Sequence, residues 1–365
     1  MTLPPLARIP AEVAAVGDYV ALAHERLSAG AWAYLAGGAG DEATLAENDA
    51  AWARLQLRQR VLRDLSGATT RTTLFGTEMT APILIAPIAF QRLAHPDGER
   101  ATAAAAAALG TPMVVSTQAS ETIEAIAAVS PAPLWFQLYI QPDRAFTTAL
   151  VRRAEQAGYR ALVVTVDAPV TGMRNREQRA GFTLPPGVEA VNLRGLPPLP
   201  PAPQDALLFG TPLAAAAPGW DDLAWLRAQT RLPLLAKGVT DPGDARRALA
   251  AGVDGIIVSN HGGRVLDGLP ATAALLPAVV EAVAGQVPVL VDGGIRRGTD
   301  IVRALALGAA AVMVGRPCIF ALAAAGAPGV AHVLRILRAE LELAMALTGC
   351  PTLAAIDRSV LAPSA

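Results

Sequence analysis

One stretch of the chain combines a potential general base with two glycines and a cation. In residues 256–264, Ile-Ile-Val-Ser-Asn-His-Gly-Gly-Arg, an apolar run is followed by His261 and, three residues later, by Arg264. Imidazole is the commonest acid–base group near neutral pH, and guanidinium binds carboxylates in a fixed geometry. The glycines allow the backbone to approach a ligand closely. The stretch predicts an active site for an anionic substrate.

Two further stretches are suited to binding phosphate. Asp292-Gly293-Gly294-Ile295-Arg296 and Gly315-Arg316-Pro317 each follow an apolar run, and each brings glycine amides next to an arginine. Backbone N–H groups and arginines at neighbouring strand ends are a common phosphate site in α/β barrels. A tight turn would explain one glycine pair but not two arginines. We therefore expect a phosphate group here.

Polar side chains also close other apolar runs. Gln137 and Tyr139 lie at the end of one run, Thr165 and Asp167 at the end of the next, and Lys237 near the end of a third, while Ser259 precedes His261. Burying such groups without partners costs free energy. Since the strand ends of a barrel converge on one face, we expect these side chains to form one ligand site.

The elements that must position these residues are eight apolar runs, each followed by an alanine-rich helical segment. They span residues 83–89, 113–117, 134–140, 161–167, 234–239, 255–260, 287–292 and 311–315. Their hydrophobicity is continuous, which is typical of strands covered on both faces in a parallel sheet. Eight units predict a closed (β/α)8 TIM barrel. An open doubly wound sheet is the alternative, but G-x-G-x-x-G is missing after the first run.

The length of 365 residues fits one barrel domain, which we assign to residues 1–365. Residues 1–80 show helical patterning at 18–29 and 41–52 and predict an N-terminal helical cap, with the barrel at 81–350. After the fourth strand, residues 184–218 are rich in proline and alanine. A loop of this length is usually functional or disordered, and we interpret it as a lid or an oligomer contact.

The composition of the chain limits the classes of partner and the cellular setting that we expect for the protein. The formal net charge is −1, which gives no general attraction to nucleic acid or anionic membranes. The two cysteines, Cys318 and Cys350, are too few for a disulfide framework and lack metal-ligand spacing, so we expect a reducing, cytoplasmic setting and no metal. No signal peptide is read at the N-terminus. Arg316 and Pro317 interrupt the most apolar region, so no membrane span is expected.

The chain resembles the FMN-dependent L-2-hydroxy acid oxidase and dehydrogenase family from about Tyr34 to about Cys350. The markers are residues 86–89 (APIA), 94–98 (AHPDG), 137–139 (QLY), 165–167 (TVD), 236–239 (AKGV), 259–264 (SNHGGR), 292–294 (DGG) and 315–317 (GRP). The resemblance implies a (β/α)8 barrel that holds FMN and oxidises an L-2-hydroxy acid to the 2-oxo acid. It also implies a homotetramer and, with oxygen as acceptor, hydrogen peroxide as product.

Matched residue by residue, the resemblance assigns the substrate site. His261 is the base and Asp167 its partner, because a carboxylate stabilises the imidazolium that forms when substrate gives up a proton. Arg174 and Arg264 bind the substrate carboxylate. Two tyrosines, Tyr34 and Tyr139, donate hydrogen bonds to the substrate.

The resemblance also assigns the flavin site. Pro87, Ile88 and Ala89 lie along the ring. Ser116, Gln137, Thr165 and Lys237 lie on its polar edge, Ser259 binds the ribityl chain, and the ribityl end and phosphate are held by Asp292, Gly293, Gly294, Arg296, Gly315 and Arg316. One departure concerns the substrate, because Gln118 stands where plant glycolate oxidases have tryptophan. A shorter polar side chain predicts a substrate larger than glycolate, lactate-like or aromatic such as mandelate.

Three alternatives remain open at this point. Within the family, a quinone or another carrier replaces oxygen as acceptor. In another class of enzyme, Lys237 forms a Schiff base with a phosphorylated carbonyl compound. A third possibility is an inactive barrel that only binds FMN or phosphate, although a binding protein has no physical need for His261, Arg264, Arg174 and Asp167 together.

Overall fold

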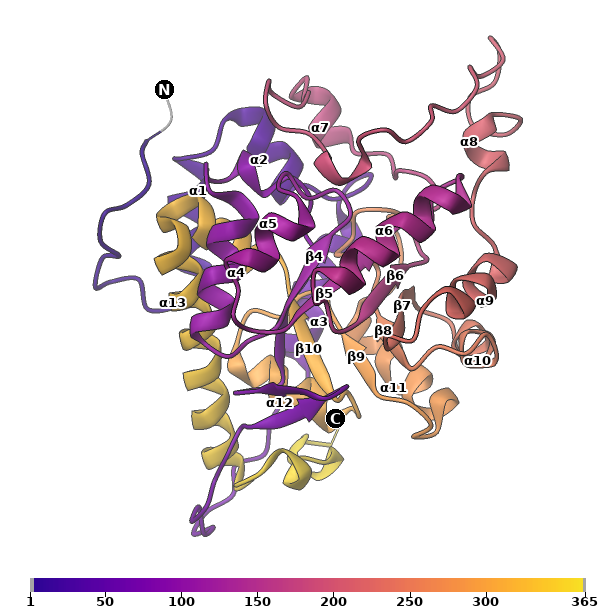
Figure 1. The fold of residues 1–365 in the computed structure, drawn as a ribbon. Helices are drawn as coiled ribbons and strands as arrows, with labels where there is room; N and C mark the ends of the chain where they lie inside the picture. The colour runs from indigo at the N-terminus through magenta and orange to yellow at the C-terminus, as the bar shows by residue number, and fades with distance from the viewer. Residues whose placement is uncertain (1–2, 364–365) are drawn as a thin grey trace.

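Eight parallel strands close into a barrel in the computed structural model, which describes residues 3–363. The strands follow the chain in spatial order, and the last pairs with the first (Figure 1). They are β3 (Ile83–Ile85), β4 (Met113–Ser116), β5 (Leu134–Leu138), β6 (Leu162–Thr165), β7 (Leu234–Val239), β8 (Gly255–Val258), β9 (Val289–Val291) and β10 (Ala311–Val314). The predicted (β/α)8 barrel is confirmed, and each strand lies within one of the eight apolar runs.

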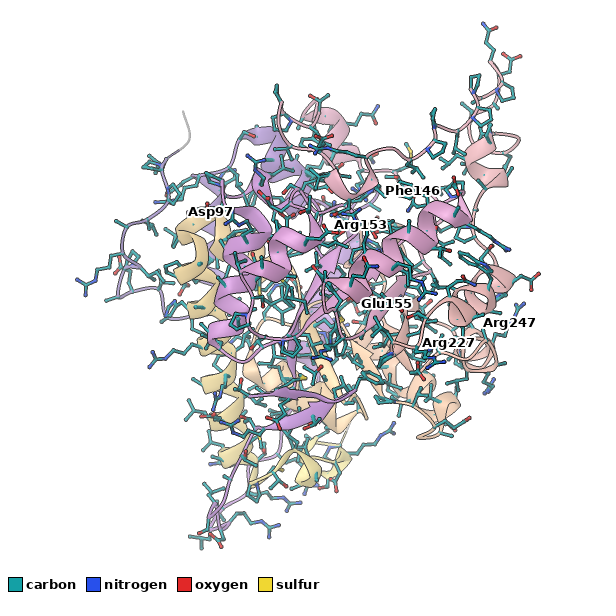
Figure 2. The ribbon with its side chains drawn as sticks, in the orientation of Figure 1. Asp97, Phe146, Arg153, Glu155, Arg227 and Arg247 are labelled. Carbon is teal, nitrogen blue, oxygen red and sulfur yellow. The ribbon has the colours of Figure 1, made fainter. Side chains whose placement is uncertain are left out.

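Helices form the outer layer. They are α4 (Gly98–Ala108), α5 (Ile123–Ala128), α6 (Arg144–Gln156), α9 (Trp220–Gln229), α10 (Pro242–Ala250), α11 (Thr272–Val283), α12 (Gly298–Ala306) and α13 (Arg316–Thr348). Local sequence sets where some begin: the Asp143 carboxylate accepts hydrogen bonds from two backbone N–H groups of α6, and Asp241 caps α10. Figure 2 shows Arg153 and Glu155 of α6 and Arg227 and Arg247 of α9 and α10 among the outer charged side chains.

The barrel interior is filled by one large side chain from each strand, so it is a packed core and not a pore. The inward-facing residues are Leu84, Val114, Trp135, Val163, Leu235, Ile257, Leu290 and Met313. A second, larger hydrophobic cluster lies between the strands and the helices and includes Tyr19 and Trp52 from the N-terminal region. The N-terminal segments therefore share a hydrophobic core with the barrel.

The first 80 residues contain more than the predicted helices. Helices α1 (Tyr19–His24), α2 (Ala29–Ala36) and α3 (Ala43–Arg54) are present, but β1 (Thr72–Leu74) and β2 (Thr77–Met79) form an antiparallel hairpin. Its Leu74 and Met79 pack against the barrel interior, and Phe75 contacts Trp135. The hairpin covers the end of the barrel opposite α2 and α7 (Figure 1). It departs from the expectation of a purely helical cap.

Between β6 and β7 the chain forms the predicted long loop. It contains α7 (Asn175–Arg179) and, within 184–218, a 3-10 turn (Val191–Leu193) and α8 (Pro212–Ala215). Leu207 and Phe209 in this loop are 102% and 90% exposed. Figure 1 shows α8 standing away from the barrel.

Helix α13 is long and apolar enough to cross a membrane by length and composition, yet 78% of its most apolar window is buried inside the protein. It packs against α1, α4 and α12. Its backbone departs from helical geometry at Ala325 and Gly326. We describe it as a core helix.

Candidate active site

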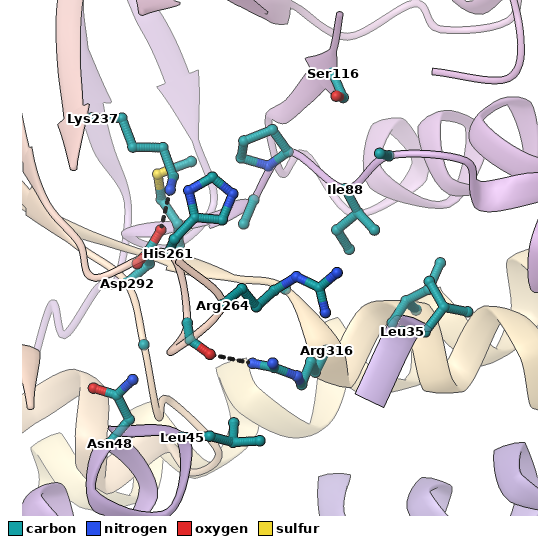
Figure 3. Close-up of a pocket in the computed structure, with 18 of the residues that line it drawn as sticks. Leu35, Leu45, Asn48, Ile88, Ser116, Lys237, His261, Arg264, Asp292 and Arg316 are labelled. Atoms are coloured by element: carbon teal, nitrogen blue, oxygen red, sulfur yellow. Dashed lines mark hydrogen bonds and ion pairs between the residues drawn. The ribbon is translucent and has the colours of Figure 1, made fainter. Parts of the chain in front are cut away.

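A cavity opens at the carboxyl ends of the barrel strands, where the polar residues that follow them converge. Of the predicted site residues it is lined by Tyr34, Pro87, Ile88, Ala89, Ser116, Gln118, Gln137, Tyr139, Thr165, Arg174, Lys237, His261, Arg264, Asp292, Gly293, Gly294, Arg296, Gly315 and Arg316. Two predicted residues, Asp167 and Ser259, lie outside it. Figure 3 shows Lys237, His261 and Asp292 on one side of the cavity and Arg264 and Arg316 on another.

Asp167 acts through His261. The two side chains follow β6 and β8, and Asp167 Oδ1 lies 3.0 Å from His261 Nδ1. An ionised Asp167 accepts the Nδ1–H and leaves Nε2 free to take a proton. Burial lowers the pKa of His261, although Asp167 opposes this, so the ring is neutral at neutral pH. The geometry provides a neutral base with a carboxylate ready to stabilise its protonated form.

Ser259 links His261 to the neighbouring Lys237. Its hydroxyl accepts hydrogen bonds from Lys237 Nζ at 2.9 Å and from the backbone N–H of His261 at 3.0 Å. Ser259 is fully buried. Its hydroxyl keeps a proton that it could still donate, and its contact with a ribityl chain stays a prediction. In this structure it orients Lys237 and the backbone of His261.

Lys237 is buried and charged. Its Nζ lies 3.2 Å from Asp292 Oδ2 (Figure 3). Burial alone would lower the pKa of Lys237, but the carboxylates of Asp292 and Asp167 outweigh it and hold that pKa above its usual value. A Schiff base requires a neutral amine, which enzymes obtain by lowering the pKa of lysine. The site therefore disfavours the Schiff-base alternative and provides a fixed positive charge at the cavity wall.

Two arginines converge beside Tyr34 and share one carboxylate. Glu177 Oε1 lies 3.2 Å from Arg174 Nη1 and 3.4 Å from Arg264 Nη2. Arg264 also donates to the backbone carbonyls of Tyr34 and Gly37 at 2.6 and 2.8 Å. Its guanidinium carbon lies 5.1 Å from the centre of the Tyr34 ring. With one acid for two buried arginines, the pair keeps a net positive charge suited to a carboxylate.

The tyrosine hydroxyls stay protonated. Burial raises the pKa of Tyr139 to about 12, and it also raises the pKa of Tyr34. Both side chains line the cavity near His261 and the arginine pair. A phenol that keeps its proton donates a hydrogen bond to an anionic or oxygen-bearing ligand.

The far end of the cavity is cationic and formed by glycine-rich turns. Burial, with the charges of Arg264 and Arg296, lowers the pKa of Arg316 to about 9. Gly293 and Gly294 have positive φ values of 91° and 78°. A Cβ on Gly294 would collide with the backbone carbonyl of Asn48. A crowded cluster of cations beside the backbone amides of a glycine-rich turn is an arrangement that an anion stabilises.

An amide edge and an apolar wall complete the cavity. Gln137 Nε2 donates to Thr165 Oγ1 at 3.0 Å, and Gln137 Oε1 lies 3.2 Å from Ser116 Oγ. Ser116 Oγ in turn accepts from the backbone N–H of Gln118. Pro87, Ile88 and Ala89 line the cavity after β3. The arrangement suits a flat heterocycle with polar groups along one edge.

Several lining residues escaped the sequence analysis. Asn48 on α3 exchanges two hydrogen bonds with Asn260, at 2.8 and 2.9 Å, and Asp49 pairs with Arg296. Glu177 was also missed, although its position three residues after Arg174 was a usable signal. Among the residues that line the cavity, the sequence analysis also missed Leu35, Leu45, Met313 and Ile319. Within residues 3–363 no group of three acidic, histidine or cysteine side chains could hold a metal ion.

Comparison with known proteins gives consistent matches over almost the whole chain. A family model described as FMN-dependent dehydrogenase matches residues 23–363. An L-lactate oxidase of Nostoc sp. is 50% identical over 352 residues, which cover 94% of this chain and 96% of that protein. Glycolate oxidase 1 of Zea mays is 49% identical, with 95% of each chain covered. A solved structure of mandelate oxidase with a difluorinated hydroxyphenylpropionic acid is 44% identical, with a TM-score of 0.86 over 94% of this chain and 98% of that one.

Proposed function

The chain belongs to the FMN-dependent dehydrogenase family, and from this premise we propose that it oxidises lactate or a larger L-2-hydroxy acid to the 2-oxo acid, with oxygen as acceptor. FMN is its cofactor. The observation that carries the proposal is that His261, paired with Asp167, shares one cavity with Arg174 and Arg264. That cavity offers a base and a carboxylate clamp at once.

The residues present fit FMN. Two buried polar atoms at the cavity, Asp292 Oδ1 and Arg316 Nε, have no hydrogen-bond partner among residues 3–363. The first suits a ribityl hydroxyl and the second a phosphate oxygen, with Arg296 and the Gly293 and Gly294 amides nearby. The ring would lie along residues 87–89, with Gln137, Thr165 and Lys237 on its polar edge. A cation there stabilises negative charge on the reduced ring, and FMN supplies a two-electron acceptor.

The protein's own groups then perform the substrate chemistry. Arg174 and Arg264 bind the carboxylate, and the hydroxyls of Tyr34 and Tyr139 orient the hydroxy acid. The acid loses two electrons and two protons in becoming the 2-oxo acid. His261 Nε2 accepts one of these protons, and Asp167 stabilises the resulting imidazolium. Oxygen takes up two electrons and two protons and becomes hydrogen peroxide.

Gln118 supports a substrate larger than glycolate. Its side chain lines the cavity after β4, close to the residues that would hold the substrate. It is shorter than tryptophan and can donate and accept hydrogen bonds. The similar proteins include oxidases named for lactate and mandelate, which supports this direction, and also oxidases named for glycolate, so the substrate test needs all three acids.

We extend the proposal to location and assembly. Both cysteines are buried and free, which supports a cytoplasmic setting. The exposed Leu207 and Phe209 support the use of the 184–218 loop as a contact in a homotetramer. Sedimentation analysis of the purified protein and of a Leu207→Ser, Phe209→Ser double variant tests this, because a smaller assembly is expected only for the variant.

An anaerobic absorbance titration tests the function. The purified yellow protein is mixed in turn with L-lactate, L-mandelate and glycolate, and air is then admitted. We expect bleaching by lactate or mandelate and rapid recolouring in air with formation of peroxide. Slow recolouring would favour another electron acceptor, and the absence of bleaching by every acid would overturn the proposal.

A further inference from the structure

One acidic side chain lies at the cationic end of the cavity. Asp49, on α3, lines the cavity, and its Oδ1 lies 3.0 Å from Arg296 Nη2. Its second oxygen lies 3.4 Å from the same nitrogen. The Asp49 side chain is 47% exposed and the Arg296 side chain 28%, which puts the pair at the rim. A guanidinium expected to bind phosphate therefore already has a carboxylate partner.

The neighbouring arginine, Arg316, has no carboxylate partner among residues 3–363. Arg316 donates to the backbone carbonyls of Gly262 and Gly37 at 2.9 and 2.7 Å, and within residues 3–363 it forms no ion pair. Its Nε is buried without a partner. The cationic end thus contains one arginine left for a ligand and one held by an aspartate.

A phosphomonoester in this end would meet Asp49 as a like charge. It carries about 1.5 to 2 negative charges near neutral pH. Asp49 Oδ1 lies 3.0 Å from Arg296 Nη2, so a phosphate that approached Arg296 would come close to a second anion. Both oxygens of the Asp49 carboxylate lie within 3.4 Å of Arg296 Nη2, which is therefore engaged before a phosphate binds.

We propose that Asp49 competes with the phosphate of FMN for Arg296 and thereby weakens cofactor binding. The inference rests on the proposed placement of the phosphate beside Arg296 and Arg316. Neutralising Asp49 frees the Arg296 guanidinium and removes a like charge. Since an ion pair at a half-exposed rim is weak, we expect FMN to bind about 2- to 5-fold more tightly to Asp49→Asn.

The experiment compares FMN with riboflavin, which lacks the phosphate. Flavin-free full-length protein, wild type and Asp49→Asn, is titrated with each flavin while flavin fluorescence is recorded. We expect the Kd for FMN to fall about 2- to 5-fold in the variant and the Kd for riboflavin to stay unchanged. Asparagine keeps the shape of the side chain and removes only its charge. Asp49→Ser serves as a second neutral variant, with the same expectation.

Glu47→Gln is the matched control. Glu47 lies on the same helix and pairs with Arg54, away from the residues that line the cavity. The substitution changes the net charge by the same amount without touching Arg296. We expect no change in the Kd for FMN, because a distant exposed charge is screened by salt.

Other outcomes would overturn the inference. Weaker binding of FMN by Asp49→Asn would mean that Asp49 orients Arg296 for the phosphate, and an unchanged Kd would mean that the two anions do not compete. An equal gain for riboflavin would mean that the effect does not involve the phosphate. The placement itself is tested by Arg316→Ala, which should weaken FMN far more than riboflavin. An equal loss for both flavins would reject the placement and not merely the role of Asp49.

Discussion

Asp167 Oδ1 lies 3.0 Å from His261 Nδ1, although the two residues are 94 positions apart in the chain. The contact joins the ends of β6 and β8 and leaves Nε2 as the free nitrogen of the base. Asp167 Oδ2 is buried and has no hydrogen-bond partner in the part of the chain that the structure describes. The carboxylate therefore has one strong partner, and its charge is directed at the imidazole.

The first prediction concerns His261 as the base. His261→Gln removes the proton acceptor but retains hydrogen-bonding ability, so we expect turnover to fall about 10²- to 10⁴-fold with FMN still bound. The rate of anaerobic bleaching by L-lactate measures this step directly. Near-normal bleaching by a flavin-loaded variant would contradict the assignment.

The second prediction concerns pH. The neutral form of His261 is required, so kcat/KM falls as the pH drops through the pKa of His261. Asp167 raises that pKa, and burial lowers it. Asp167→Asn removes the raising effect, so the acidic limb of the pH profile should move to lower pH while the maximal rate falls about 10- to 10³-fold. A limb that moves to higher pH would contradict this coupling.

The third prediction concerns Gly238, which follows Lys237 in β7. It has a φ of 106° and lies where the register with β8 shifts. A Cβ at this position would lie 2.8 Å from Asp167 Oδ1 and collide with its side-chain carbons. Gly238→Ala should displace Asp167 and lower kcat at least about 10-fold, with FMN retained. The pH profile should shift as in Asp167→Asn.

Gly158→Ala is the control for Gly238→Ala. Gly158 also has a positive φ, 85°, but nothing lies within 4 Å of a Cβ added there. An alanine at this position strains the backbone but has no neighbouring atom to displace. We expect lower thermal stability and unchanged kcat, and an equal loss of kcat in both variants would attribute the effect to strain alone.

The fourth prediction concerns substrate size. Gln118→Trp should fill the cavity beside the substrate and lower kcat/KM for L-mandelate at least about 10-fold more than for glycolate. Gln118→Leu, which is closer in volume to glutamine, should change this ratio little. A constant ratio of the two kcat/KM values in the tryptophan variant would show that Gln118 does not contact the substrate side chain.

The barrel could be predicted from the sequence because its strands are buried on both faces. Residues 311–314 are continuously apolar, and β10 occupies those residues. The β1–β2 hairpin could not be predicted in this way. Each of its strands has three residues, too few for a periodic pattern, and their packing against Trp135 depends on the closed barrel.

The site could be predicted where its residues follow strands. Topology alone brings the ends of parallel barrel strands together, so Lys237, His261 and Arg316 follow from strand order. Asn48 and Asp49 could not be found, because their position depends on how α3 packs over the turn at Gly293 and Gly294. The contact of the Ser259 hydroxyl with Lys237 Nζ could not be predicted either, because strand order alone does not give the side-chain partners.

Arg316 is the first residue of α13, and that helix packs against α1, α4 and α12. A ligand that binds only the folded form adds about 2.7 kcal/mol of stability at a hundred times its Kd. A chain that has lost FMN would thus unfold more readily, in addition to being inactive.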